Sequence, residues 1–79
     1  MNDADILEHI QALVDEEHQL QSRTEHPLGE AESERQRQIE VALDQCWDLL
    51  RQRRARREYG DNPDDAALRS PNTVENYRQ

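Results

Sequence analysis

Residues 39–50 read IEVALDQCWDLL, and this stretch decides the fold. Its apolar side chains recur every three or four residues, which is the spacing of one face of an α-helix. At about 100° per residue the face is an arc of roughly 160°. A single neighbouring helix would leave part of so wide an arc in water. The arc contains Ile39, Leu43, Cys46 and Leu50, flanked by Trp47 on one side and by Ala42 and Leu49 on the other.

The helix that contains this stretch is predicted to run from about residue 30 to residue 59. It begins with an acidic first turn, its last turns are rich in arginine, and Gly60 and Pro63 follow it. Acidic side chains favour the start of a helix, basic ones favour its end, and glycine is the preferred residue just beyond the end. Both ends of the helix are therefore indicated by the sequence.

A second helical pattern precedes it, from about residue 3 to residue 23. Its apolar arc is roughly 140° wide and extends from Leu20 round to Leu7. Pro27 and Gly29 interrupt the periodicity between the two helices, which predicts a turn at residues 24–29.

The predicted fold class is all-α, with residues 1–59 forming an antiparallel two-helix hairpin. Because the second arc is so wide, we expect two hairpins to dimerise into a four-helix bundle. This register places Ile6 beside the segment 47–50. The side chains expected in the core or in the dimer contact are Ile6, Ile10, Leu13, Ile39, Leu43, Cys46, Trp47 and Leu50.

Residues 60–79 are predicted to be a polar tail with a short helix over 71–77. Ser70 and Pro71 suit the cap and the first position of such a helix. Val74 and Tyr77 would then anchor it to the hairpin.

The composition of the chain restricts the classes of protein to which it can belong. The chain has 79 residues, a formal charge of −8 and one cysteine, Cys46, so an intramolecular disulfide is excluded. A lone cysteine suits a reducing compartment. No secretory leader and no apolar run long enough to cross a bilayer stands out. We therefore expect a cytoplasmic protein without a membrane segment.

Residues 51–57 (RQRRARR) carry five positive charges in an otherwise acidic chain. These guanidinium groups are a candidate interaction surface, and contact with phosphates would give salt-dependent nucleic-acid binding. Pairing with the acids at 3, 5, 61, 64 and 65, or with a second subunit, is favoured instead. An acidic protein partner is a further alternative. The arginine run consists of Arg51, Arg53, Arg54, Arg56 and Arg57.

Glu17 falls in the middle of the apolar arc of the first helix, where an unpaired carboxylate would be costly. Arg35, at the edge of the second arc, is the nearest cation in the predicted register. An ion pair between Glu17 and Arg35 is therefore predicted in the core.

No motif indicates catalysis, a metal or a cofactor. Asp15 and His18 have the spacing of metal ligands in helical bundles, but Asp15 points away from the apolar arc. Cys46 lies on the core side with no histidine expected near it, so it behaves as a small apolar residue. We expect a protein that is not an enzyme.

Two stretches carry a resemblance to a known family: residues 12–20 (ALVDEEHQL) and residues 43–58 (LDQCWDLLRQRRARRE). They resemble a family of short uncharacterised actinobacterial proteins, a domain of unknown function. A Val-Glu-x-Tyr near the C-terminus, at residues 74–77, is also similar to the ending of that family. The resemblance implies a small cytosolic helical protein and implies no activity, ligand or catalytic residue.

The functional hypothesis is a non-catalytic oligomeric protein, most simply a homodimer, that interacts with or regulates another protein. The alternative is a nucleic-acid-associated protein that uses the arginine run.

Overall fold

The computed structural model describes residues 2–22 and 29–76. In chain order its elements are α1 (Asp3–Ser22), α2 (Glu30–Glu58), a short 3-10 helix η1 (Pro63–Asp65) and α3 (Pro71–Asn76). Every element of the described residues is helical, so the predicted all-α class is confirmed. Most of the predicted turn, and Tyr77, lie outside the described residues.

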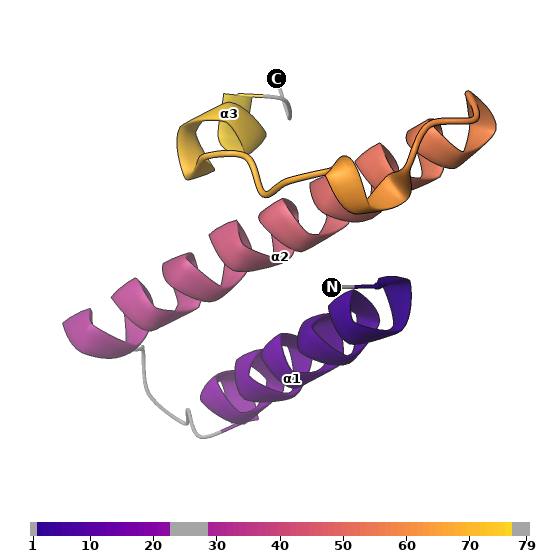
Figure 1. Cartoon of the computed structure of the whole chain (residues 1–79). Coiled ribbons are helices and arrows are strands. Elements are labelled where there is room, and N and C mark those ends of the chain that lie inside the picture. Colours follow the sequence, from indigo (N-terminus) through magenta and orange to yellow (C-terminus); the bar gives the residue numbers. More distant parts are fainter. Residues whose placement is uncertain (1, 23–28, 77–79) are drawn as a thin grey trace.

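The two long helices lie side by side and antiparallel, and the tail folds back along the opposite side of α2 (Figure 1). The hydrophobic core lies mainly between α1 and α2, because the apolar arcs of both helices face each other there. Ile6 and Ile39 are the largest fully buried side chains. The core cluster consists of Ile6, Ile10, Leu13 and Leu20 from α1 and of Ile39, Cys46 and Leu49 from α2.

The tail covers one flank of α2 that the hairpin alone would leave exposed. Gln52 Nε2 donates to Oδ2 of the buried Asp48 at 2.8 Å and to the carbonyl oxygen of Ala67 at 2.9 Å. Gln45 Nε2 donates to the carbonyl oxygen of Arg69 at 3.1 Å, and Arg69 Nε lies 3.5 Å from Asp48 Oδ2. Part of the coverage that the sequence led us to expect from a second copy therefore comes from the chain itself.

The start of α1 is fixed by a reciprocal cap. The backbone N–H of Asp5 donates to Asn2 Oδ1 at 2.8 Å, and the backbone N–H of Asn2 donates to Asp5 Oδ2 at 3.2 Å. This arrangement satisfies donors that have no partner inside the helix. At the start of α3 the N–H of Thr73 donates to Ser70 Oγ at 3.2 Å, so the predicted cap at Ser70 is present.

The end of α2 depends on Gly60. Its φ is 78°, in the left-handed region that glycine occupies without strain. The N–H of Asp61 donates to the carbonyl oxygen of Arg56 at 2.7 Å, and the N–H of Gly60 donates to that of Arg57 at 3.2 Å. Together these bonds form a Schellman motif. The motif reverses the chain and directs the tail back along α2.

Candidate functional site

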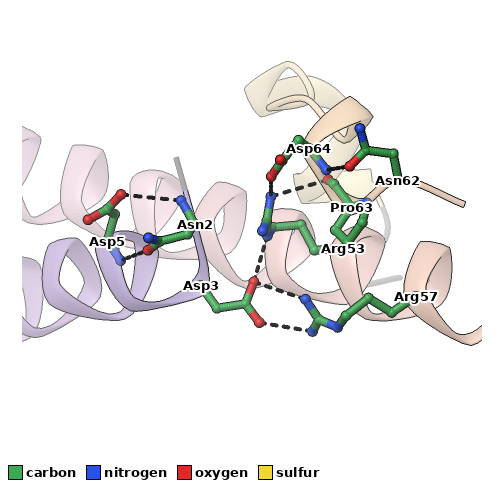
Figure 2. A network of polar contacts seen from close by, with 8 residues as sticks. All are labelled: Asn2, Asp3, Asp5, Arg53, Arg57, Asn62, Pro63 and Asp64. Atoms are coloured by element: carbon green, nitrogen blue, oxygen red, sulfur yellow. Dashed lines mark hydrogen bonds and ion pairs between the residues drawn. The ribbon is translucent and has the colours of Figure 1, made fainter.

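Arg53 is the centre of a polar network that joins three parts of the chain. Its side chain is only 8% exposed and comes from α2. Nε donates to Asp3 Oδ1 of α1 at 2.5 Å. Nη1 donates to Asp64 Oδ1 at 3.0 Å and to the carbonyl oxygen of Pro63 at 3.2 Å, both in η1 (Figure 2). One guanidinium group therefore fastens both the start of α1 and the tail to α2.

Arg57 supports the same network, one turn further along α2. Its Nη2 lies 2.8 Å from Asp3 Oδ2 and its Nη1 lies 3.2 Å from Asp3 Oδ1. Hydrogen bonds from Arg57 and then from Arg53 hold the pKa of Asp3 below the usual range of aspartate, because they favour the charged carboxylate. Asp3 also lies in the first turn of α1, where a negative charge complements the helix dipole.

The other arginines of the run face outward to different degrees. Arg54 Nε lies 3.2 Å from Glu58 Oε1 one turn away, and the Arg54 side chain is 78% exposed. Arg51 is exposed and Arg56 is half-buried. Arg56 lines an open hollow of about 300 Å³ together with Tyr59 and Arg69. The run is thus divided between a network centred on the buried Arg53 and a solvent-facing part.

The predicted ion pair between Glu17 and Arg35 is wrong. Arg35 instead forms a two-pronged pair with Glu16: Nε lies 2.5 Å from Oε2 and Nη2 lies 2.7 Å from Oε1. Glu16 lies about 100° round the helix from Glu17, toward the flank of the buried stripe. The pair at this flank keeps both charges partly hydrated, because the side chains of Arg35 and Glu16 are 45% and 38% exposed. The hydrogen bonds from Arg35 hold the pKa of Glu16 below the usual range of glutamate.

Cys46 is buried and unpaired in the core. Desolvation raises the pKa of its thiol, which favours the neutral form and lowers its reactivity. Contrary to the sequence-based expectation, a histidine lies in the neighbourhood: His9 and Cys46 line the same hollow of about 100 Å³, which Leu68 of the tail also lines.

One further surface is apolar. Leu7 of α1 remains 49% exposed and Trp47 of α2 remains 45% exposed. Val14, Leu43 and Leu50 pack against the core but are only partly buried. By helical spacing all five lie on the same edge of the antiparallel pair, turned away from the tail-facing positions such as Asp48. We call this surface, made of Leu7, Val14, Leu43, Trp47 and Leu50, the apolar face.

The eight side chains predicted for the core or the dimer contact therefore separate into two groups. Ile6, Ile10, Leu13, Ile39 and Cys46 are buried in the core, whereas Leu43, Trp47 and Leu50 belong to the apolar face. The sequence placed Leu7 only at the edge of an arc, and it gave no sign that Asp48 would be buried. The exposure of these side chains depends on where the tail packs, and helical periodicity carries no information about that.

Within residues 2–22 and 29–76, no group of three or more His, Cys, Asp or Glu side chains could hold a metal ion. In the same part of the chain, none of the helices has both the length and the apolar character needed to cross a bilayer.

These features define a small helical-hairpin protein with a packed tail, an internal arginine network and an exposed apolar face. The chain belongs to the family described as a protein of unknown function, DUF2630, which matches residues 2–79. The predicted membership of a family of short, uncharacterised actinobacterial proteins is confirmed.

Among its relatives are uncharacterized protein Rv0898c of Mycobacterium tuberculosis H37Rv and uncharacterized protein Mb0922c of Mycobacterium bovis. Each is 50% identical to this chain over 77 residues, which cover 95% of this chain and 88% of the relative. No solved structure matches the chain.

Proposed function

We propose that this protein is a non-catalytic interaction protein that acts as a homodimer in the cytoplasm. The observation that carries the proposal is the apolar face, where Leu7 and Trp47 are each about half exposed beside three partly buried aliphatic side chains. Single exposed apolar residues are ordinary on protein surfaces, whereas a contiguous set of them is typical of a binding surface. The neutral, buried thiol of Cys46 and its lack of a disulfide partner suit a reducing compartment.

The shape of the chain supports association. Its radius of gyration is 14.8 Å, with extents of 50 × 25 × 15 Å. A compact domain of this length would have a radius of about 12 Å. An elongated chain of 79 residues buries little of its surface, and small domains of this kind gain stability by association.

A second copy is the partner that suits this surface best. The tail runs along the side of α2 that faces away from α1 (Figure 1), and it contacts Gln45, Asp48 and Gln52, none of which belongs to the apolar face. Two such hairpins packed through their apolar faces would form a four-helix bundle with a shared core. Trp47 would be the central anchor, because tryptophan is enriched among the residues that dominate binding energy.

Nucleic-acid binding by the arginine run is the less favoured alternative. Arg53 and Arg57 are bonded to Asp3, and Arg54 is paired with Glu58. Phosphate contacts would compete with these pairs in a chain whose net charge is −8. The pairs favour a structural role for much of the run.

Sedimentation equilibrium at tens of micromolar tests the proposal. We expect the wild-type chain to be dimeric and Trp47→Glu to be monomeric with an unchanged helical circular dichroism spectrum. The matched control is Tyr59→Glu, because Tyr59 is another exposed aromatic residue, 83% exposed, at the C-terminal cap of α2 and outside the apolar face. A monomeric wild-type chain, or a Trp47→Glu variant as dimeric as the control, would overturn the proposal.

The nucleic-acid alternative has its own measurement. Fluorescence anisotropy with labelled RNA and DNA would show binding that weakens steeply with salt if the outward arginines contact phosphates. The variant Arg51→Glu/Arg54→Glu/Arg56→Glu should then lose binding while it keeps its fold, since it leaves Arg53 and Arg57 in place. Such a result in a monomeric protein would favour the alternative.

A further inference from the structure

The outward stripe of α2 has opposite charges at equal distances from its central aromatic residue. Glu40 lies seven residues before Trp47 and Arg54 lies seven residues after it. Seven residues are about two helical turns, so all three side chains project from the same side of the helix. Leu43 and Leu50 fill the intervening turns of this stripe. The stripe therefore reads acidic, apolar, basic along the chain.

Both charged positions are available to a partner. Glu40 is exposed, and Arg54 makes a solvent-exposed pair with Glu58 of the same helix, at 3.2 Å. Exposed pairs of this kind contribute little to stability and exchange readily for better ones. The next charged positions repeat the polarity, with Asp44 before Trp47 and Arg51 after it.

We propose that a second copy of this chain docks on the apolar face with its α2 antiparallel to the first, about a two-fold axis beside Trp47. This inference rests on the proposed homodimer and specifies how its two subunits meet. Glu40 then faces Arg54 of the partner subunit, and Arg54 faces Glu40 of the partner subunit, on either side of the two Trp47 side chains. One surface patch is thereby complementary to itself, as a two-fold interface requires.

The same charges also disfavour a dimer in which the two α2 helices are parallel. If the two α2 helices were parallel and in register, Glu40 would face Glu40 of the partner subunit, and Arg54 would face its own copy. Like charges in contact are destabilising, so the charge pattern selects the antiparallel orientation as well as supporting it. Specificity of orientation follows from the same two residues.

The overlap in this arrangement is extensive. Residues 36–58 of one α2 would lie against the same residues of the other, a length of about 34 Å at about 1.5 Å per residue. Leu7 of α1 lies beside Trp47 in the hairpin register and would close the contact from the side. The tail makes polar contacts with this part of α2 at Gln45, Asp48 and Gln52, which do not belong to the apolar face.

Charge exchange tests the orientation. In the full-length chain, Glu40→Arg and Arg54→Glu should each raise the dimer Kd about tenfold, because each creates two like-charge contacts across the axis. The double variant Glu40→Arg/Arg54→Glu should return the Kd to within about threefold of wild type. The matched control is the exchange of Glu34 and Arg37, an exposed pair at 3.0 Å on another side of α2, which should leave the Kd unchanged.

The outcomes separate the orientation from dimerisation itself. Weakened single variants and a restored double variant would support the antiparallel contact. The orientation would be overturned if the wild-type chain dimerises and neither single exchange changes the Kd. It would also be overturned if the double variant dimerises more weakly than either single variant. Both results would leave the homodimer intact. A wild-type chain that stays monomeric would overturn the proposed function and this inference together.

Discussion

Two adjacent residues of α1 provide the most discriminating test of the fold, because the sequence places both on one apolar arc and the structure separates them. Ile6 is 1% exposed, in contact with the core cluster, whereas Leu7 is 49% exposed on the apolar face. Replacing each by alanine removes a similar volume of apolar side chain. The two variants therefore differ mainly in where the lost contacts were.

We expect Ile6→Ala to reduce the free energy of unfolding by about 3 kcal/mol, since a fully buried Ile to Ala change removes transfer energy and leaves a cavity. A chain of this length has a total stability of roughly 4–12 kcal/mol. The melting temperature should fall by roughly 12–24 °C, at about 4–8 °C per kcal/mol. Leu7→Ala removes a side chain already half in water, so we expect a loss of only about 1 kcal/mol in the monomer.

Thermal denaturation followed by circular dichroism at two protein concentrations measures both effects. The melting temperature of Ile6→Ala should be low at each concentration. The wild-type melting temperature should rise with concentration, and Leu7→Ala should show a smaller rise because it weakens the dimer. Equal losses in the two variants, or an Ile6→Ala melting temperature close to that of wild type, would refute the assignment of Ile6 to the core and Leu7 to the surface.

Three further predictions concern the charged contacts. Arg53→Gln should lower the melting temperature more than Arg54→Gln, because only Arg53 is buried and joined to both α1 and the tail; equal effects would contradict the network. Because the folded-state pKa of Asp3 is depressed, its pairing stabilises the chain above the unfolded pKa and is lost as pH falls through the folded value. An acid titration of the melting temperature should therefore show a decline below about pH 4 that is smaller in Asp3→Asn. Finally, Glu16→Gln should lower the melting temperature more than Glu17→Gln, and the reverse order would restore the pairing that the sequence first suggested.

Local sequence patterns were sufficient to predict the helices of this fold and several of the positions where they begin and end. The periodicity of the apolar residues is a property of each helix alone, so it predicted α1, α2 and the buried positions Ile6 and Ile39. The bend after α2 was equally local, because Gly60 adopts the left-handed backbone angle of the motif without strain. These features depend on a few consecutive residues, and a sequence records them directly.

The partners of charged side chains were harder to predict from the sequence. Glu16 and Glu17 are neighbours in sequence, and the choice between them for Arg35 depended on the rotation of α1 against α2. The two carboxylates lie one residue apart, which is about 100° of rotation around the helix axis. Helical periodicity averages over several residues and does not fix that rotation.

What the sequence by itself determined is the all-α class, the two long helices, the cap at Ser70 and the excess of apolar surface on α2, because each is set by short-range spacing and backbone preference. What only the tertiary structure decided is how that excess is covered. The tail packs over the flank at Asp48, Arg53 fastens both ends of the chain to α2, and the uncovered remainder becomes the apolar face around Trp47. These contacts join residues up to fifty positions apart. Their geometry follows from the packing of whole elements, so no local pattern in the sequence contains it.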